Sequence, residues 1–351
     1  MNLIFFQNCI SPHQIPYISE CINDPRVKEI YLIAPRIDYS KRKDMGWDSA
    51  NLLKRTHIKC ILEPNDIQIC QLLENNSNLF CLFSGIRADK DVFHWFKLSL
   101  RYQVKRYIIT EPPYTYNKPL WMHYIRFYIQ DYRFVRSING IFGIGEMAVN
   151  YYRKISKRWK VFPFQYVTQT IQRTIPSPSG KIKLLFVGSL IPRKNVKIVI
   201  KALKNNPNID FTIIGDGIEK DKLERLSNQN NINVSFLGTQ PMNEIAKFMQ
   251  QHDILILPSL HDGWGAVVNE AMTLGLYVIV SNRCGAKALI THKEDGYIYR
   301  CNSIKDLRQA LQYITDNIEN IRANVKNRIE QSERIQGKNV AKYFINCLLQ
   351  P

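Results

Sequence analysis

Residues 253–285, DILILPSLHDGWGAVVNEAMTLGLYVIVSNRCG, contain the pattern that decides the fold of this chain. Within them, DILILP at 253–258 and LYVIVS at 276–281 are apolar on both faces, which predicts two buried strands. Apolar side chains recur at helical spacing over 265–274 and predict a helix between these strands. Such strands, separated by helices, are typical of a parallel sheet that is covered on both sides.

The turn DGWG at 262–265 leads from the first strand into this helix. The first amides of a helix, here those of residues 265–267, have no intrahelical acceptor and attract phosphate groups. Glu270 lies roughly 7.5 Å along the helix axis at 1.5 Å per residue, where it can reach a ribose hydroxyl. The plainer interpretation is that the glycines let a helix pack closely on its strand.

The second half of the chain continues this alternation of strand and helix. Its pattern predicts one Rossmann-like α/β unit. The further expected strands are 182–188, 209–215 and 232–237, and the further expected helices are 195–205, 219–228 and 241–251.

The first half repeats the rhythm less regularly and predicts a second Rossmann-like unit. Its expected strands are 2–6, 27–34, 58–62, 78–84, 104–110 and 139–143. The polar stretch at 167–181, with two prolines and a glycine, fits a linker between domains, and we place the boundary near residue 175.

The tail from about residue 303 is helical in pattern and ends in VAKYFINCLL. We therefore expect an N-terminal domain at 1–175 and a C-terminal domain at 176–333. The helix at 334–351 carries apolar residues at helical spacing, so we expect it to pack back on the N-terminal domain.

Length and composition exclude several classes of protein. A chain of 351 residues suggests two domains, and 45% hydrophobic with 22% charged residues is typical of a globular protein, not a disordered or fibrous one. The longest apolar runs are far shorter than the roughly 18 to 20 residues of a membrane-spanning helix. The N-terminus lacks the basic region of a secretory signal, and eight scattered cysteines suggest reduced thiols, so we expect a cytoplasmic protein.

The chain is strongly basic, with a formal net charge of +18. Residues 1–175 carry 25 Lys and Arg against 14 Asp and Glu. Such an excess indicates a nucleic acid, an anionic membrane surface or a phosphorylated ligand as partner.

Three ordered motifs identify a resemblance. FVGSLIPRKNVKIVIKAL at 186–203, FTIIGDGIEKDKLERL at 211–226 and PSLHDGWGAVVNEAMTLGLYVIVS at 258–281 resemble the group 1 (family 4) retaining glycosyltransferases of GT-B fold. The resemblance implies two Rossmann-like domains that face each other across a cleft. It also implies transfer of a sugar from a nucleotide sugar, UDP- or GDP-linked, with retention of configuration and without a metal or other cofactor.

The resemblance assigns roles to individual residues. It implies that Glu270 binds the donor ribose, that Asp262 lies beside the transferred sugar, and that Arg193 and Lys194 hold the diphosphate. The expected donor-binding residues are Gly188, Ser189, Arg193, Lys194, Gly263, Trp264, Gly265, Ala266, Val267 and Glu270, and the expected catalytic residues are Asp262, Glu270 and His13.

Two departures from the family pattern affect these assignments. Asp262 stands where a Glu is usual, and Ser189 stands where an Arg is frequent, so Arg193 is expected to carry more of the phosphate. A solvated helix start is the alternative interpretation of the basic pair at 193–194.

Acceptor-side candidates follow strands of the first half. His13 and Gln14 lie in the turn after the first strand, and Glu111 follows the strand that ends at Thr110. The alternatives are a histidine at a helix start without a chemical role and an ordinary loop carboxylate.

The sequence Asp89-Lys90-Asp91 formally matches the DxD metal motif of another glycosyltransferase fold. Asp89 is equally suited to cap the helix that VFHWFKL predicts, and we favour this capping role over the metal motif. The other histidines, His123 and His261 among them, have no partner at catalytic spacing and are interpreted as packing or surface residues.

The segment 119–136 combines six aromatic residues with Arg126, Arg133 and Arg136. This composition suits a helix that rests on an anionic membrane, while core aromatics flanked by solvated arginines are the alternative. Sedimentation with anionic liposomes distinguishes the two interpretations.

These features favour a glycosyltransferase of surface polysaccharide biosynthesis that acts on a glycan or lipid-linked glycan, peripheral to the inner face of the cytoplasmic membrane. An epimerase or hydrolase of the same fold, which would turn over the donor without an acceptor, is the nearest alternative. A nucleic-acid-binding protein is disfavoured because the sequence has no helix-turn-helix, zinc-finger or RNA-recognition signature.

Overall fold

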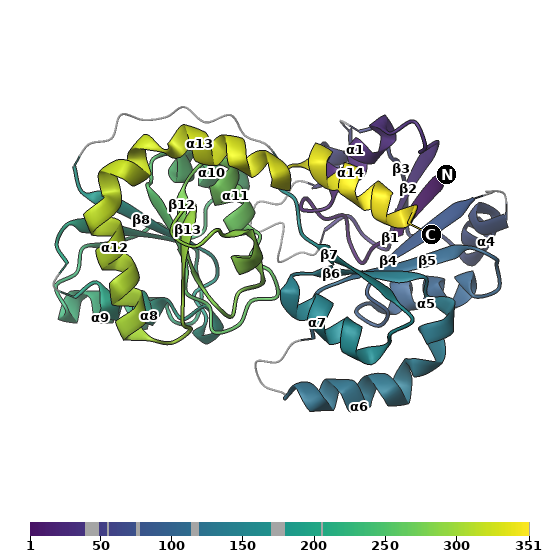
Figure 1. Ribbon diagram of the computed structural model, residues 1–351, viewed down its shortest axis with the longest axis horizontal. Coiled ribbons are helices and arrows are strands. Elements are labelled where there is room, and N and C mark those ends of the chain that lie inside the picture. Colours follow the sequence, from purple (N-terminus) through teal and green to yellow (C-terminus); the bar gives the residue numbers. More distant parts are fainter. Residues whose placement is uncertain are drawn as a thin grey trace. The chain divides into compact units, whose positions relative to one another are not determined.

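The computed structural model describes residues 1–38, 49–54, 56–74, 78–113, 119–169, 180–204 and 206–350. Contacts divide the chain into two compact units. The N-terminal unit comprises residues 1–169 and 335–351, and the C-terminal unit comprises residues 170–334. The boundary expected near residue 175 lies outside the described residues. Each unit is an α/β structure (Figure 1) and is described by itself.

The N-terminal unit contains a seven-stranded sheet of order β3-β2-β1-β4-β5-β6-β7. Every neighbouring pair in it is parallel. The strands are β1 Asn2–Phe6, β2 Glu29–Ala34, β3 Lys59–Leu62, β4 Leu79–Ser84, β5 Lys105–Thr110, β6 Gly140–Ile144 and β7 Lys160–Phe164.

The C-terminal unit contains a six-stranded sheet of order β10-β9-β8-β11-β12-β13, again with parallel neighbours. This order is that of a Rossmann sheet, which reverses between β8 and β11. The strands are β8 Ile182–Val187, β9 Ile209–Ile214, β10 Val234–Phe236, β11 Ile254–Leu257, β12 Tyr277–Ser281 and β13 Gly296–Tyr299.

Helices connect the strands of both sheets, as parallel pairing requires. In the N-terminal unit they are α1 Ile15–Glu20, α3 Ser49–Lys54, α4 Asp66–Glu74, α5 Lys90–Ser99, α6 Leu120–Gln130, α7 Glu146–Ile155 and α14 Gly337–Leu348, with the 3₁₀ turns η1 Cys21–Asn23 and η2 Tyr132–Ser137. In the C-terminal unit they are α8 Val196–Ala202, α9 Lys220–Gln229, α10 Met242–Gln250, α11 Val267–Thr273, α12 Ile304–Ala323 and α13 Val325–Gln331, with η3 Pro192–Lys194 and η4 Gly285–Leu289. The turn η5, Ser332–Ile335, spans the junction of the two units.

The structure confirms all eleven expected strands to within a few residues and adds two, β7 and β13. Both additional strands lie at an edge of their sheet. The strand β7, KVFPF, contains Pro163, which an edge strand tolerates because one side of its backbone needs no ladder partner. The strand β13, GYIY, is short and begins with a glycine, so its sequence gives little strand signal.

The last helix, α14, packs on the N-terminal unit beside α1 (Figure 1). Its Phe344 is fully buried, with ring centroids 4.7 Å from Phe142, 5.5 Å from Tyr17 and 5.9 Å from Phe5. A Cβ added at Gly337 would lie 2.6 Å from the Pro16 carbonyl oxygen, so the helix start needs a glycine to approach α1 this closely.

No helix in the described part of the chain combines the length and apolarity that a membrane crossing needs.

We predict that Phe344→Ala lowers the free energy of unfolding of the N-terminal unit by about 3–5 kcal/mol, because it leaves a cavity in an aromatic cluster. Urea denaturation followed by circular dichroism measures the loss. Tyr343→Ala, on the same helix but 41% exposed, is the control and should cost less than half as much. Equal losses for the two variants would contradict the docking of α14 through Phe344.

Candidate functional site

The candidate site of the C-terminal unit lies where the strand order of its sheet reverses. The strands β8 and β11 are neighbours there, and their connections leave in opposite directions. Ligands of open α/β sheets bind at such a point, outside the carboxyl ends of the strands. The expected donor residues 188–194 follow β8, and the expected residues 262–270 follow β11.

An ion-pair cluster joins these two segments. Lys194 Nζ lies 2.6 Å from Asp262 Oδ2, and Arg193 Nη1 lies 3.7 Å from the same oxygen. The Lys194 and Asp262 side chains are only 15% and 12% exposed. Three residues predicted from two separate motifs therefore meet in one largely desolvated cluster, where charges interact more strongly than at the surface.

Backbone contacts fix the two cations. The Arg193 carbonyl accepts from the Leu260 amide at 2.8 Å, and Arg193 Nη1 donates to the His261 carbonyl at 2.6 Å. A Cβ added at Gly188 would lie 3.9 Å from Lys194 Cε, which places this glycine directly beside the lysine. The loops after β8 and β11 thus hold each other as well as the ion pair.

Glycines make the adjoining loops tight. Gly215, with φ +130°, follows β9, and any Cβ there would overlap the Gly188 carbonyl group. A Cβ at Gly217, which has φ +156°, would likewise overlap the Leu190 carbonyl group. The motif IIGDG therefore serves to press the loop after β9 against the loop after β8. Ser189 lies half-buried in the loop after β8.

The segment after β12 holds the turn at 262–265 in place through hydrogen bonds. The Asp262 amide donates to the Arg283 carbonyl at 3.2 Å, and the Gly285 amide donates to the Asp262 carbonyl at 3.0 Å. Cys284 Sγ lies 2.9 Å from the Trp264 carbonyl oxygen, and burial raises the pKa of the Cys284 thiol, so it remains a protonated donor. Sequence reasoning missed this contribution because residues 283–285 belong to a different strand connection.

Trp264 and Gly265 shape the turn from within. The Trp264 indole is 2% exposed and donates from Nε1 to Asn269 Oδ1 at 2.7 Å. Gly265 has φ +95°, and a Cβ there would lie 2.6 Å from Leu257 Cδ2. The Trp264 ring therefore faces the interior, and the neighbouring residues Gly263, Ala266 and Val267 are half-buried.

Glu270 occupies the short helix α11, which begins at Val267 instead of the expected residue 265. Its side chain is half-buried, and burial raises the pKa of Glu270 to about 7. Within the described residues, no cation is paired with its carboxylate. Such a group favours a ligand that donates hydrogen bonds to it.

The acceptor-side candidates of the N-terminal unit are linked through Tyr166. Tyr166 Oη donates to Glu111 Oε1 at 2.8 Å, and the ring centroids of Tyr166 and His13 are 6.0 Å apart. Gln14 is buried and accepts a hydrogen bond from Gln7. His13 and Glu111 therefore belong to one neighbourhood, although they are about 100 residues apart in the sequence.

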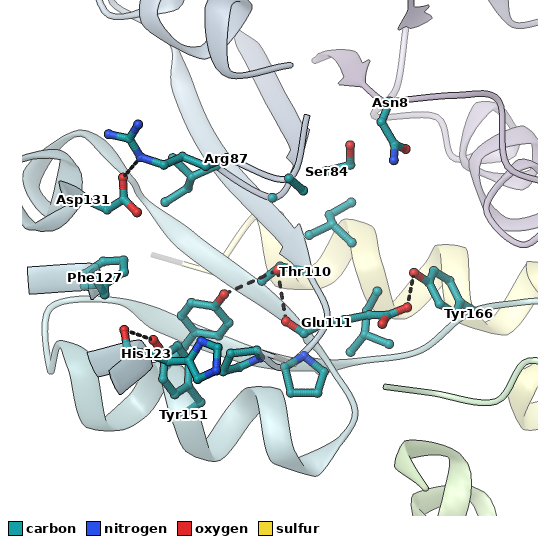
Figure 2. Close-up of a pocket in the computed structure, with 18 of the residues that line it drawn as sticks. Asn8, Ser84, Arg87, Thr110, Glu111, His123, Phe127, Asp131, Tyr151 and Tyr166 are labelled. Carbon is teal, nitrogen blue, oxygen red and sulfur yellow. Dashed lines mark hydrogen bonds and ion pairs between the residues drawn. The ribbon is translucent and has the colours of Figure 1, made fainter. Parts of the chain in front are cut away.

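A pocket of about 540 Å³ lies at the carboxyl edge of the N-terminal sheet (Figure 2). Glu111 and Gln14 line it, whereas His13 lies outside the lining. Other lining residues that sequence reasoning did not select are Asn8, Ser84, Arg87, Thr110, His123, Arg126, Asp131, Tyr151 and Tyr166. Polar residues at or shortly after strand ends, such as Ser84 at the end of β4 and the nearby Arg87, were the available signal.

The structure supports the capping interpretation of Asp89. Its carboxylate accepts from the amides of Asp91 at 2.9 Å and Val92 at 3.4 Å at the start of α5. Asp91 is paired with Arg36 at 3.7 Å. The described residues contain no group of three or more His, Cys, Asp or Glu side chains that is suited to hold a metal ion.

Residues 167–332 match the sequence model of the family Glycosyl transferases group 1. An uncharacterized glycosyltransferase of Methanocaldococcus jannaschii is 32% identical over 136 residues, 38% of each chain. The UDP-Gal:alpha-D-GlcNAc-diphosphoundecaprenol alpha-1,3-galactosyltransferase of Escherichia coli is 32% identical over 165 residues, 44% of this chain and 41% of that protein. The chain thus spans about two fifths of the length of these curated relatives.

Among solved structures, Anabaena HepE in complex with UDP matches with a TM-score of 0.72 over 99% of both chains, at 14% sequence identity. At this identity the match establishes the fold. The protein therefore has the GT-B fold of two Rossmann-like domains, and its residues 167–332 match the group 1 glycosyl transferases.

Proposed function

We propose that this protein is a hexosyltransferase that moves a sugar from a nucleotide sugar to a glycan or lipid-linked glycan, with retention of configuration. The observation that carries the proposal is the cluster of Arg193, Lys194 and Asp262 at the switch point of the C-terminal sheet, with Glu270 on the adjoining helix. The group 1 match over 167–332 supports it.

The chemistry of the cluster suits departure of a nucleoside diphosphate. When the bond between the anomeric carbon and the diphosphate oxygen breaks, the oxygen keeps the electron pair and gains negative charge. Lys194 offers a compact positive charge and Arg193 a planar donor fork, both already oriented and only 15% and 25% exposed to solvent. The acceptor hydroxyl oxygen forms the new bond to the anomeric carbon, and its proton passes to the departing diphosphate.

Asp262 takes the position beside the transferred sugar in this proposal. Its Oδ2 is paired with Lys194, so the carboxylate both orients the lysine and retains Oδ1 as an acceptor for a sugar hydroxyl. Retention through a covalent intermediate needs a carboxylate that is free to attack the anomeric carbon. Because Asp262 is held in an ion pair, we assign it positioning of the sugar and not nucleophilic attack.

Glu270 takes the ribose in this proposal. A half-buried carboxylate with a raised pKa gains most from a ligand whose hydroxyls donate to it. UDP is the nucleotide in the HepE complex, and the E. coli relative is named for UDP-Gal, which supports UDP before GDP as the donor base.

The acceptor and location are the finer part of the proposal. The E. coli relative is named for a sugar linked to diphosphoundecaprenol, and other similar proteins are named for O-antigen and lipopolysaccharide core biosynthesis. These names support a lipid-linked acceptor in surface polysaccharide synthesis, reached from an anionic membrane surface on the cytoplasmic side. His13, Gln14 and Glu111 are the acceptor-side candidates of the N-terminal unit.

Turnover with and without acceptor tests the transferase against an epimerase or hydrolase of the same fold. Purified protein is incubated with UDP- and GDP-sugars, and released nucleoside diphosphate and donor isomers are followed by chromatography. Release that requires acceptor supports the proposal, and the anomeric proton coupling of the product reports retention. Equal release or isomerisation without acceptor would favour the alternative.

We predict that Lys194→Ala lowers kcat for transfer about 100- to 1000-fold, because it removes one preorganised donor to the leaving diphosphate. The exposed Lys201→Ala on α8 is the charge-matched control and should leave kcat unchanged. A similar kcat for both variants would remove Lys194 from the proposed site.

We predict that affinity for the nucleotide sugar is about tenfold weaker at pH 6 than at pH 8. The pKa of Glu270 is raised to about 7 and the ribose hydroxyls donate to its ionised form, so affinity falls as protonation increases below pH 7. Titration calorimetry with a UDP-sugar, whose phosphates do not titrate in this range, measures the change.

Glu270→Gln should remove this pH dependence, and Glu270→Ala should weaken binding about 10- to 100-fold at pH 8. The exposed Glu294→Gln is the control and should retain the pH profile. An unchanged profile in Glu270→Gln would exclude this residue from ribose binding.

A further inference from the structure

A row of exposed apolar side chains runs along α6 and into η2. This α6 stripe consists of Trp121, Ile125, Tyr128, Ile129 and Tyr132, which are 48–79% exposed. Their spacing of three or four residues places them on one face of the helix. Scattered exposed apolar residues are ordinary, but a continuous row of five, two of them isoleucine, marks an interaction surface.

The opposite face of α6 is firmly held. The Phe127 ring is buried and meets the Trp159 ring edge-on with centroids 5.6 Å apart, and the Tyr124 ring stacks on Tyr151 at 4.8 Å. Tyr151 Oη donates to the His123 carbonyl at 3.0 Å. The helix is therefore anchored to α7 and the segment that follows it (Figure 1), and its stripe is kept outward.

The surroundings of the stripe are strongly basic. Residues 119–160 contain two acidic residues, of which Asp131 is buried and paired with Arg87. Tyr128 Oη donates to the Ile155 carbonyl at 3.4 Å, which brings the basic end of α7 beside the stripe. The basic residues of this stretch are all exposed: Arg126, Arg133, Arg136, Arg153, Lys154, Lys157, Arg158 and Lys160.

The exposed apolar stripe and the basic residues around it indicate which partner binds this surface. We propose that α6 lies in the headgroup region of an anionic lipid bilayer, with the α6 stripe inserted among the acyl chains and the basic residues on the lipid phosphates. Aromatic and branched aliphatic residues flanked by Arg and Lys are the features of helices that bind membrane surfaces. A second copy of this chain is disfavoured, because the docking of two such basic borders would bring like charges together.

Membrane docking through α6 also deepens the proposed function, on which this step rests. The same helix contributes Arg126, and His123 and Phe127 (Figure 2), to the lining of the N-terminal pocket, and its C-cap residue Asp131 lines it too. The pocket therefore lies about one helix diameter, roughly 10 Å, from the stripe. A ligand in it would be close to lipid headgroups, which favours an acceptor whose polar head enters the pocket while its lipid remains in the bilayer.

The pocket has groups that suit such a polar head. Ser84 Oγ and His123 Nε2 are buried beside it and have no hydrogen-bond partner among the described residues. Arg126 adds a cation that is not paired with a carboxylate in the described part of the chain, in reach of a phosphate. Hydroxyl and phosphoryl oxygens of a lipid-linked glycan would satisfy these donors and acceptors.

Vesicle sedimentation tests the docking without any donor or acceptor. The full chain is mixed with vesicles of phosphatidylcholine alone, or of equimolar phosphatidylcholine and phosphatidylglycerol, at low and high salt. Ile125→Gln with Ile129→Gln removes two stripe residues. Ile67→Gln with Ile218→Gln is the matched control, because these two isoleucines are 68% and 85% exposed outside the stripe.

We predict sedimentation with the anionic vesicles that weakens at high salt, and an affinity about tenfold lower for the stripe variant than for the control variant. Trp121 should shift its emission to the blue on binding, measured as the difference between wild type and Trp121→Phe. Equal binding by the two double variants, or no binding to anionic vesicles, would overturn the proposal. So would a dimer in solution that only the stripe substitutions dissociate.

A second measurement distinguishes a failure of membrane docking from a failure of the proposed glycosyltransferase function. Transfer to a lipid-diphosphate-linked sugar in vesicles is compared with transfer to a water-soluble analogue that lacks the lipid. The stripe variant should lose rate at least about tenfold with the vesicle-borne acceptor and retain the rate with the soluble one. Equal loss with both acceptors would contradict the inference, whereas inactive wild type that still binds vesicles would contradict only the proposed function.

Discussion

Parallel pairing of all neighbouring strands is the constraint on which both candidate sites depend. It forces every strand of a sheet to end at the same edge, so residues from distant parts of the sequence meet there. In the C-terminal unit this edge brings Lys194 after β8 against Asp262 after β11. In the N-terminal unit it brings Ser84, Glu111 and Tyr166 to one pocket.

The two units use this shared geometry differently. The edge of the C-terminal sheet is closely packed: glycine loops press against one another, and a largely desolvated ion pair joins them. The edge of the N-terminal sheet is open and lined by aromatic, basic and hydroxyl side chains. A tight, preorganised charge cluster suits a diphosphate of fixed shape, whereas a wide polar pocket suits a larger ligand, in keeping with the proposed division between donor and acceptor.

Much of the C-terminal site was predictable, because its chemistry is local to short motifs. Gly188, Arg193 and Lys194 lie within seven residues, and Asp262 and Glu270 lie within nine. The N-terminal pocket was predictable only in Gln14 and Glu111. Its other residues come from six separate segments, each carrying one to three polar side chains that are ordinary in isolation. Edge strands such as β7 were missed because they tolerate residues that central strands exclude.

The sequence alone determined the fold class, the order of strands and helices, and the identity of the charged residues of the C-terminal site, because hydrophobic periodicity and short motifs are properties of neighbouring residues. Tertiary structure decided which of these residues touch, how deeply each carboxylate is buried, and which face of α6 remains outside. The raised pKa of Glu270 and the exposure of the α6 stripe are examples. The pKa and the exposure both depend on which residues from elsewhere in the chain pack against these side chains, and the spacing of residues along the sequence does not determine that packing.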